Sequence, residues 1–269
     1  MSGKMRESFF QENAVIITGA SSGIGRELAF QLADQGAWLA LASRNAGKLE
    51  DVSHQCRQRG GRSICIPTDV ADQAQCRNLV EATVSEYGRI DTLINNAGIG
   101  HDARFDELPD LVVFEKVIRV NFFGSVYCTH YALPHLKKSS GRLVCVSSLR
   151  GKYPSTTADG YGESKHALAG FCDSLRMELA STGVSVTTIY PGWVSTGISS
   201  RALKPDGTTR EKISRLEEGA MPADACARTI IQAMARRKRE VVMTLEGKLG
   251  LWLKLIAPGF VDRIVRKKG

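Results

Sequence analysis

The sequence has no apolar run long enough to cross a bilayer, and its first eleven residues contain only Phe9 and Phe10 as an apolar run. A secretory leader needs a longer apolar core, so we expect neither a membrane span nor a leader. The seven cysteines are scattered and form no CxxC pair. Their odd number and apolar neighbours are typical of small core residues in a reducing compartment, which predicts a cytoplasmic protein without a disulfide framework or metal site.

The chain also lacks an even spread of positive charge. Its formal net charge is +8, but from Arg236 onward there are ten basic and three acidic residues, so the preceding body is close to neutral. A basic patch at one end, with Trp252 as the aromatic residue beside it, fits a surface contact better than a nucleic-acid groove. We therefore expect no nucleic-acid partner.

Apolar strand-like segments alternate with helix-like segments along almost the whole chain. No repeat, low-complexity segment or interdomain linker interrupts them, and 269 residues allow one large α/β domain. Such strands indicate a parallel sheet covered on both faces. We predict one doubly wound domain over 1–269, with a substrate lid at 193–220 and seven strands near 14–18, 38–42, 63–66, 90–94, 142–146, 184–189 and 241–243. Helices are expected after Gly25 and near 46–59, 72–87, 111–136 and 161–181.

The first expected strand ends at Thr18 and is followed by Gly19, Gly23 and Gly25, after which the pattern becomes helical. Strand, tight glycine turn and helix place a phosphate on exposed N–H groups at the helix N-terminus. Gly19 would allow the turn, Gly23 would let the backbone approach a pyrophosphate, and Gly25 would let helix and strand pack closely. The alternative is an ordinary glycine-rich connection.

Polar residues gather at other strand ends, where open α/β sheets bind ligands. Ser147 and Ser148 end the fifth expected strand, and the next helix begins with Tyr161 and carries Lys165 one turn later on the same face. A lysine ammonium favours the phenolate and should lower the tyrosine pKa, which makes Tyr161 a candidate general acid/base. Each feature alone also arises by chance or as turn chemistry.

The motifs Thr18–Gly25 (TGASSGIG), Asp69, Asn95–Gly98 (NNAG), Asn121, Ser148, Tyr161-xxx-Lys165 and Pro191–Gly192 occur in the order seen in short-chain dehydrogenases/reductases. The chain resembles that family from about residue 14 to 244. The resemblance implies a Rossmann fold and an NAD(P)-dependent oxidoreductase acting on alcohols and carbonyls. It implies that Tyr161 is the acid/base, that Ser148 polarises the carbonyl, that Lys165 binds the nicotinamide ribose and that Asn121 holds a relay water. Ser148 is preferred to Ser147 because its separation from Tyr161 matches the family spacing.

The resemblance also implies a set of cofactor-binding residues. Asp69 is expected at the adenine, Asn95 below the cofactor and Thr196 near the carboxamide. The full set is Gly19, Ser21, Ser22, Gly23, Ile24, Gly25, Ser43, Arg44, Asp69, Val70, Asn95, Ala97, Gly98, Tyr161, Lys165, Pro191, Gly192, Val194 and Thr196.

The end of the second expected strand bears on the choice of cofactor. NAD-specific enzymes usually present a carboxylate there, whereas this chain has Ala42, Ser43 and Arg44. A guanidinium suits a 2′-phosphate, so we predict NADP(H) in preference to NAD(H). Ser22 stands where many NADP enzymes carry a second basic residue, and Arg44 could instead be a solvated loop arginine.

Other polar residues are less diagnostic. Gly162 and Glu163 depart from the small residues more usual after the tyrosine, and 155–160 is unusually polar, so the substrate mouth should differ from that of relatives. We expect the Glu163 carboxylate to point away from the site, because it would otherwise oppose phenolate formation. His166 should face another side of its helix, and His101 and Asp102 are expected in a solvated loop, with the substrate mouth as the alternative.

The C-terminal segment 245–269 combines an apolar stretch with basic residues. It would be a short helix that closes the substrate pocket or contacts a subunit, or a peripheral contact with an anionic membrane surface. It resembles the tails of membrane-associated hydroxysteroid and lipid-linked relatives, which favours an apolar steroid-, retinoid- or lipid-like substrate. Relatives are mostly dimers or tetramers, so a homodimer or homotetramer is expected. A catalytically silent nucleotide sensor or scaffold is the alternative function.

Overall fold

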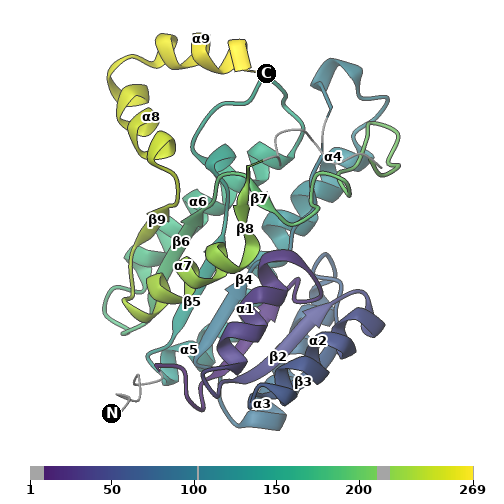
Figure 1. The fold of residues 1–269 in the computed structure, drawn as a ribbon, viewed down its shortest axis with the longest axis vertical. Helices are drawn as coiled ribbons and strands as arrows, with labels where there is room; N and C mark the ends of the chain where they lie inside the picture. The colour runs from purple at the N-terminus through teal and green to yellow at the C-terminus, as the bar shows by residue number, and fades with distance from the viewer. Residues whose placement is uncertain (1–8, 102, 211–218, 269) are drawn as a thin grey trace.

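The computed structural model describes residues 9–101, 103–210 and 219–268, and its centre is a parallel sheet of seven strands (Figure 1). The strand order is β3-β2-β1-β4-β5-β6-β9, and every neighbouring pair runs parallel. This confirms the predicted doubly wound α/β fold. The strands are β1 (Ala14–Thr18), β2 (Trp38–Ser43), β3 (Arg62–Pro67), β4 (Thr92–Asn95), β5 (Arg142–Val146), β6 (Ser185–Tyr190) and β9 (Glu240–Val242).

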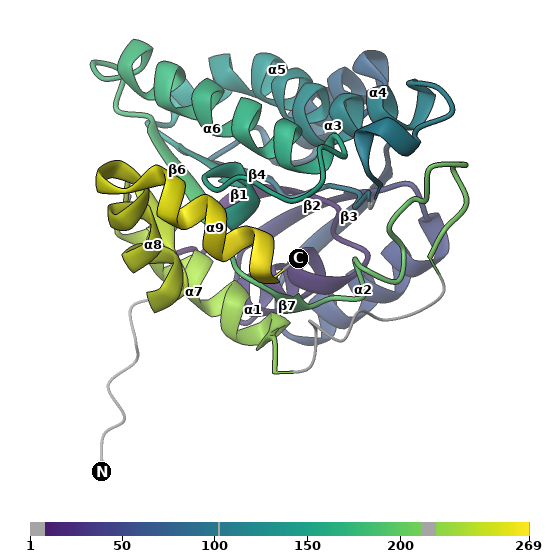
Figure 2. The same cartoon turned by 90° about the horizontal axis from the view of Figure 1, so that it is seen from above.

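Helices cover both faces of the sheet, as Figure 2 shows. One face carries α1 (Gly23–Ala33), α2 (Ala46–Gln58) and α7 (Ala223–Ala235), and the other carries α3 (Gln73–Tyr87), α5 (Gly124–Lys138) and α6 (Tyr161–Glu178). Each strand therefore needs apolar residues on both sides, which explains the near-continuous apolar runs in the sequence.

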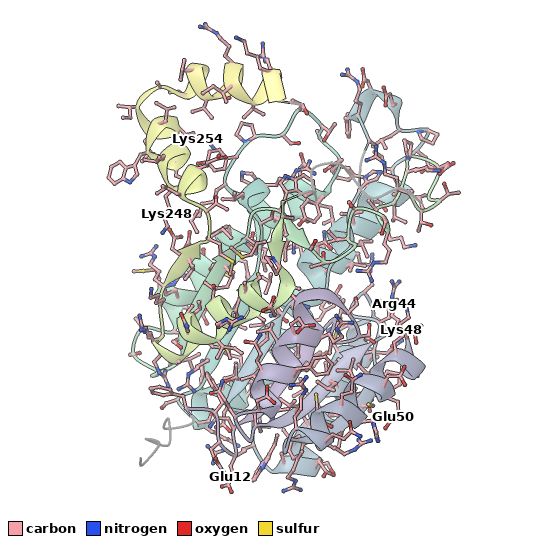
Figure 3. All side chains as sticks on the ribbon, in the orientation of Figure 1. Glu12, Arg44, Lys48, Glu50, Lys248 and Lys254 are labelled. Atoms are coloured by element: carbon pink, nitrogen blue, oxygen red, sulfur yellow. The ribbon has the colours of Figure 1, made fainter. Side chains whose placement is uncertain are left out.

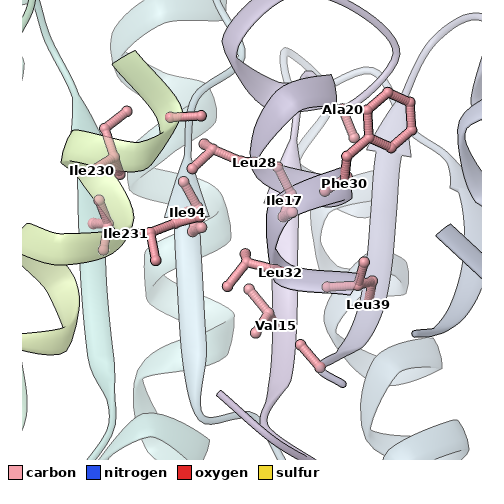
Figure 4. Close-up of a cluster of buried hydrophobic side chains, with 14 of the residues drawn as sticks. Val15, Ile17, Ala20, Leu28, Phe30, Leu32, Leu39, Ile94, Ile230 and Ile231 are labelled. Carbon is pink, nitrogen blue, oxygen red and sulfur yellow. The ribbon is translucent and has the colours of Figure 1, made fainter. Parts of the chain in front are cut away.

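The two apolar cores follow the period-two alternation of a strand. Val15 and Ile17 of β1 pack with Leu28 of α1 and Ile230 of α7, a cluster drawn in Figure 4. The intervening Ile16 belongs to the opposite core, together with residues of α3, α5 and α6. Burial of a large aliphatic side chain contributes about 1.5–3 kcal/mol, so this alternation fixes which face of the sheet each helix covers.

The reversal of strand order lies between β1 and β4. The chain leaves β1 toward β2 and β3 on one side, and leaves β4 toward β5 and β6 on the other. A crevice forms at the carboxyl ends of the strands at such a point. The glycine turn follows β1 there and the Asn95–Gly98 segment follows β4, so the fold brings these motifs together.

The long helix expected at 111–136 is present with an irregularity. It consists of α4 (Val112–Ile118), a π-helical turn at Arg119–Phe123 and α5, without a break in the chain direction. π-Helical turns are rare and are often found at functional sites. Asn121 lies within this turn.

The described part of the segment predicted as a lid, 193–220, and the C-terminal segment flank the sheet; this predicted segment is called the lid below. β7 (Val194–Ser195) pairs with β8 (Met221–Pro222) at the base of the lid, and the lid residues 211–218 lie outside the described residues. The C-terminal segment forms α8 (Leu245–Ile256) and α9 (Pro258–Lys268), drawn in yellow in Figure 1 beyond β9. Within the described ranges, no helix is both long enough and apolar enough to cross a membrane. All seven cysteines are free thiols.

Candidate active site

The glycine turn after β1 is held against the lid and leaves a helix N-terminus open. Gly19 and Gly23 have positive φ angles of 68° and 55°, which glycine adopts without strain. A Cβ on Gly25 would overlap the Gly19 carbonyl oxygen, and one on Gly23 would lie 2.9 Å from Thr196 Cβ. The N-cap residue Ser22 makes no side-chain capping bond and the first turn of α1 has no acidic residue. These N–H groups therefore fit a phosphate of a dinucleotide.

The segment after β4 is hydrogen-bonded to the residue that precedes this turn. Asn96 Nδ2 donates to Thr18 O at 2.9 Å, and the Ala97 N–H donates to Thr18 Oγ1 at 3.0 Å. The Asn95 side chain instead donates to Thr129 Oγ1 at 2.9 Å and is almost fully buried. Asn95 thus ties β4 to α5, and Asn96, which sequence reasoning passed over, is the asparagine that contacts the glycine turn.

The π-helical turn places Asn121 beside the start of the loop after β4. Its Oδ1 accepts the Ile99 N–H at 2.8 Å, and its Nδ2 donates to Ile99 O at 3.0 Å and to Ser164 Oγ at 3.1 Å. A Cβ on Gly98 would lie 3.2 Å from Asn121 Oδ1 and 3.5 Å from Lys165 Nζ. Asn121, Gly98 and Lys165 therefore meet at one point at the carboxyl edge of the sheet.

Lys165 and Tyr161 extend from α6 toward the end of β5. Lys165 is 4% exposed, its Nζ donates to Val146 O at 2.9 Å, and Nζ lies 5.8 Å from the centre of the Tyr161 ring. Ser147 Oγ donates to Lys165 O at 3.0 Å, so this hydroxyl is used within the core. Ser148 Oγ accepts the Arg150 N–H at 3.2 Å and is also within hydrogen-bonding reach of Tyr161. The geometry thus favours Ser148 over Ser147 as the serine beside the tyrosine.

The titration of this pair corrects one expectation. Burial raises the pKa of Tyr161 above its ordinary value, although the hydrogen bond with Ser148 and the charge of Arg150 act in the opposite direction. Burial also lowers the pKa of Lys165 to about 8. The expected net lowering of the tyrosine pKa is wrong for this structure, because burial of the phenol outweighs the groups that lower it, and the Lys165 ammonium donates to the Val146 carbonyl.

An ion pair that the sequence analysis did not identify lies next to Tyr161. Arg150 Nη2 donates to Asp159 Oδ2 at 2.8 Å, and the guanidinium carbon lies 5.3 Å from the Tyr161 ring centre. Asp159 is fully buried, and its Oδ1 accepts the Tyr161 N–H at 3.0 Å at the start of α6. The polar run before Tyr161 therefore anchors the tyrosine.

Two neighbours complete this anchor. The Glu163 carboxylate accepts the Gly160 N–H at 2.9 Å, so it turns back on its own helix, as expected.

His101 was expected in a solvated loop, but it is 2% exposed. Its Nδ1 contacts the Asp159 carbonyl, and its backbone bridges to Leu203 in the lid. That expectation is wrong, because the lid covers the loop. Asp102 lies outside the described residues. His166 is exposed, and its Nδ1 contacts Gly162 O.

The remaining expected cofactor residues lie along the same edge. The Ala20 N–H donates to Ala42 O at 3.1 Å, so the glycine turn adjoins the end of β2 that leads into Ser43 and Arg44. Arg44 is exposed, and Figure 3 shows it next to Lys48. Asp69 Oδ1 accepts the Ala71 N–H at 3.0 Å, and Val70 is buried. Pro191 accepts the Leu149 N–H at 2.9 Å, which ties the start of 191–196, including Gly192 and Val194, to the segment after Ser148.

A cavity of about 660 Å³ lies between the loop before Tyr161 and α9. Its lining is mainly polar, so it does not by itself indicate an apolar ligand. The lining residues are Arg104, Pro154, Ser155, Thr156, Thr157, Asp262, Val265 and Arg266.

The helix N-terminus at the strand-order reversal is open, and Ser148, Tyr161 and Lys165 meet beyond β5 at the same edge of the sheet. Both features are typical of a dinucleotide-binding α/β oxidoreductase. The family model described as short chain dehydrogenase matches residues 13–206. The chain belongs to the short-chain dehydrogenase/reductase family, and it is an NAD(P)-dependent enzyme acting on CH–OH or C=O groups. This confirms the assignment made from the motifs.

Similar proteins agree with this membership. The chain is 35% identical over 256 residues to 11-beta-hydroxysteroid dehydrogenase-like 2 of Arabidopsis thaliana, covering 93% of this chain and 80% of that protein. It is 32% identical to an 11-beta-hydroxysteroid dehydrogenase of Pinus massoniana, covering 92% and 71%. The fold resembles that of a short-chain dehydrogenase/reductase from Burkholderia phymatum in complex with NAD, with a TM-score of 0.82, 24% identity and coverage of 95% and 96%.

Proposed function

We propose that the protein is an NADP(H)-dependent oxidoreductase that interconverts an alcohol and a carbonyl on a largely apolar substrate. The observation that carries the proposal is the meeting of Ser148, Tyr161 and buried Lys165 at the carboxyl edge of the sheet, next to the open N-terminus of α1. The fold binds a nicotinamide cofactor, and this proposal adds the phosphate preference, the proton donor and the substrate class.

In the reducing direction, the Tyr161 hydroxyl donates a proton to the substrate oxygen, and the Ser148 hydroxyl donates a hydrogen bond to the same oxygen. A bound nicotinamide supplies the hydride. The positive charge of Lys165 stabilises the phenolate that remains, and the same lysine binds the nicotinamide ribose. Asn121, held between Ile99 and Ser164, positions a water that returns the proton. In the oxidising direction Tyr161 accepts the proton.

The NADP(H) preference rests on the end of β2. No carboxylate stands at Ala42–Arg44 to accept hydrogen bonds from a ribose 2′-hydroxyl, and the exposed Arg44 guanidinium can pair with a 2′-phosphate. Arg44 makes no ion pair with any residue that the structure describes.

The proposal of an apolar substrate is supported by the names of similar proteins and by the C-terminal segment. Several similar proteins are named as hydroxysteroid dehydrogenases, a class with apolar substrates. In this chain α8 exposes Leu245, Leu249, Trp252 and Ile256 at positions that share one helix face, with exposed fractions of 62–79%. Lys248 belongs to the same helix, and α9 follows with further basic residues along the chain. Such a surface suits peripheral contact with an anionic membrane, where apolar substrates concentrate.

The decisive experiment measures absorbance of the reduced nicotinamide with purified protein, NADPH or NADH, and a panel of apolar ketones and aldehydes. The proposal expects oxidation of NADPH that disappears in Tyr161→Phe. Tight NADPH binding without turnover of any carbonyl would favour the alternative of a silent nucleotide sensor. Absence of cofactor binding would contradict the proposal.

A further inference from the structure

Arg201 in the lid is bonded directly to the glycine turn, although 179 residues separate it from its partner there. Its Nη1 donates to Ser22 Oγ at 3.0 Å, its Nε donates to Gly197 O at 3.0 Å, and its Nη2 donates to Thr196 O at 2.9 Å. One guanidinium thus joins the beginning of the lid to the start of α1. Figure 2 shows β7, which precedes this segment, next to α1.

Backbone packing supports the closeness of the lid and the turn. The position that a Cβ would occupy on Gly23 is 2.9 Å from Thr196 Cβ and 3.1 Å from Thr196 Cγ2. The segment that carries Arg201 therefore packs against Gly23. The guanidinium needs no large movement to reach the N-terminus of α1.

Among the residues that the structure describes, the bonds of Arg201 do not balance its charge, because the acceptors are uncharged oxygens. The N-terminus of α1 adds the positive end of a helix dipole, and its first turn has no acidic residue. The serine at the N-cap leaves the helix N–H groups uncapped, and its hydroxyl accepts a bond from the arginine instead. An uncapped helix end beside an uncompensated guanidinium favours an oxyanion.

We propose that Arg201 is a phosphate-binding residue of the cofactor site. When the dinucleotide binds, the guanidinium exchanges Ser22 Oγ for a phosphate oxygen and keeps its bonds to the Thr196 and Gly197 carbonyls. The inference rests on the proposed NADP(H)-dependent function. It assigns to the lid the positive charge that Ser22, standing where many related NADP enzymes have a basic residue, does not provide.

The two bonds of Arg201 to backbone carbonyls of the lid would favour phosphate binding. A guanidinium already held by two backbone carbonyls loses little side-chain freedom when the phosphate arrives. The exchanged bond changes from a neutral acceptor to a charged one, and charge-assisted hydrogen bonds are roughly twice as strong as neutral ones. Cofactor binding should therefore favour the position of Arg201 at the Thr196 and Gly197 carbonyls.

The test measures dissociation constants for NADPH and for NADH by fluorescence titration of the full chain at low and at high salt. Variants are Arg201→Gln and Arg201→Lys, and Arg228→Gln on α7 is the matched control, since Arg228 is also an exposed arginine. We expect Arg201→Gln to weaken NADPH binding by about tenfold or more, Arg201→Lys to weaken it less, and Arg228→Gln to change it by less than about twofold.

Salt dependence separates a phosphate contact from a structural latch. If the guanidinium pairs with phosphate, the affinity ratio of wild type to Arg201→Gln shrinks as salt screens the pair. A loss of affinity confined to NADPH would show that Arg201 binds the 2′-phosphate. An equal loss of affinity for NADH would show that it binds the pyrophosphate. Either result supports the inference. A ratio that does not change with salt would show that Arg201 only holds the lid in place, and this result would overturn the inference.

Binding by wild type separates a failure of the Arg201 assignment from a failure of the proposed function. If wild type binds NADPH and Arg201→Gln binds it equally well, only the assignment of Arg201 fails. If wild type binds neither dinucleotide, the proposed function fails together with this inference.

Discussion

Arg150 lies over the ring of Tyr161, with its guanidinium carbon 5.3 Å from the ring centre, while its Nη2 is bonded to the fully buried Asp159. The two charges act on the phenol in opposite directions, since Arg150 lowers the pKa of Tyr161 and Asp159 raises it. Tyr161 thus faces two cationic side chains, Arg150 and Lys165, and one anion, whereas Glu163 is turned back to the Gly160 N–H.

The first prediction concerns this arginine. Arg150→Gln removes a positive charge beside the phenol, so the pKa of Tyr161 should rise further. In the oxidising direction, where the phenolate is the base, the rising acidic limb of kcat/KM should move to higher pH. Arg150→Lys keeps the charge and should move the limb less than Arg150→Gln. A profile that is unchanged in Arg150→Gln, with only a uniform drop in rate, would mean that Arg150 acts through packing alone.

The second prediction tests Tyr161 directly. Tyr161→Phe removes the proton donor but keeps the ring, so kcat/KM should fall by about 10²–10⁴-fold or more, as expected for loss of general acid/base catalysis. The dissociation constant for NADPH, measured by fluorescence titration, should stay close to that of wild type. Retained turnover would transfer the acid/base role to another group.

The parallel sheet and the places of the motifs along the chain could be predicted because they depend on local patterns. Each apolar strand is flanked by its own turn residues. The strand order, whose reversal between β1 and β4 brings Gly19 and Ala97 together, depends on long-range pairing and was not predicted. The same locality explains why Tyr161 and Lys165 were assigned to one helix face.

What could not be predicted depends on contacts between distant residues or on small backbone irregularities. The π-helical turn at Asn121 leaves no trace in apolar spacing. The bond from Arg201 to Ser22 and the burial of His101 both depend on where the lid folds. The polarity of 155–160 was visible in the sequence, but its meaning required the position of Arg150, whose charge compensates Asp159.

The third prediction links Lys165 to stability. Burial lowers its pKa from 10.5 to about 8, so the folded state disfavours the ammonium. A lowered lysine pKa destabilises the fold fully below pH 8, and this cost disappears as pH rises toward 10.5. The shift corresponds to roughly 3 kcal/mol at neutral pH. Lys165→Met should therefore be inactive yet unfold in urea at a higher midpoint than wild type at pH 7, with a smaller difference at pH 10. An equal difference at both pH values would contradict this origin.

The fourth prediction concerns cofactor choice at the end of β2. Arg44→Asp replaces a guanidinium with a carboxylate that repels a 2′-phosphate and can accept hydrogen bonds from a ribose 2′-hydroxyl. Affinity for NADPH should fall by about tenfold or more, while affinity for NADH should hold or improve. The neighbouring Lys48→Asp serves as a control for general charge. Equal changes in affinity for NADPH and NADH would show that Arg44 does not determine the preference for NADP(H).

The last prediction concerns the exposed face of α8. A double substitution, Leu249→Glu with Trp252→Glu, places two charges on a face that contacts no other described element closely enough to be buried, since these side chains are 62% and 71% exposed. Flotation with anionic liposomes should carry wild type upward and leave the variant in the soluble fraction, because burial of this face in the lipid interface supplies the affinity. Met177→Glu on α6 is the matched control, since Met177 is 73% exposed on a different element. The tail rests on the segment after Ser148, where Lys254 Nζ donates to Lys152 O at 2.7 Å, so activity must be measured alongside. If wild type does not float but elutes as a dimer that the double variant dissociates, the face is a contact between two copies of the chain, and the membrane proposal is wrong.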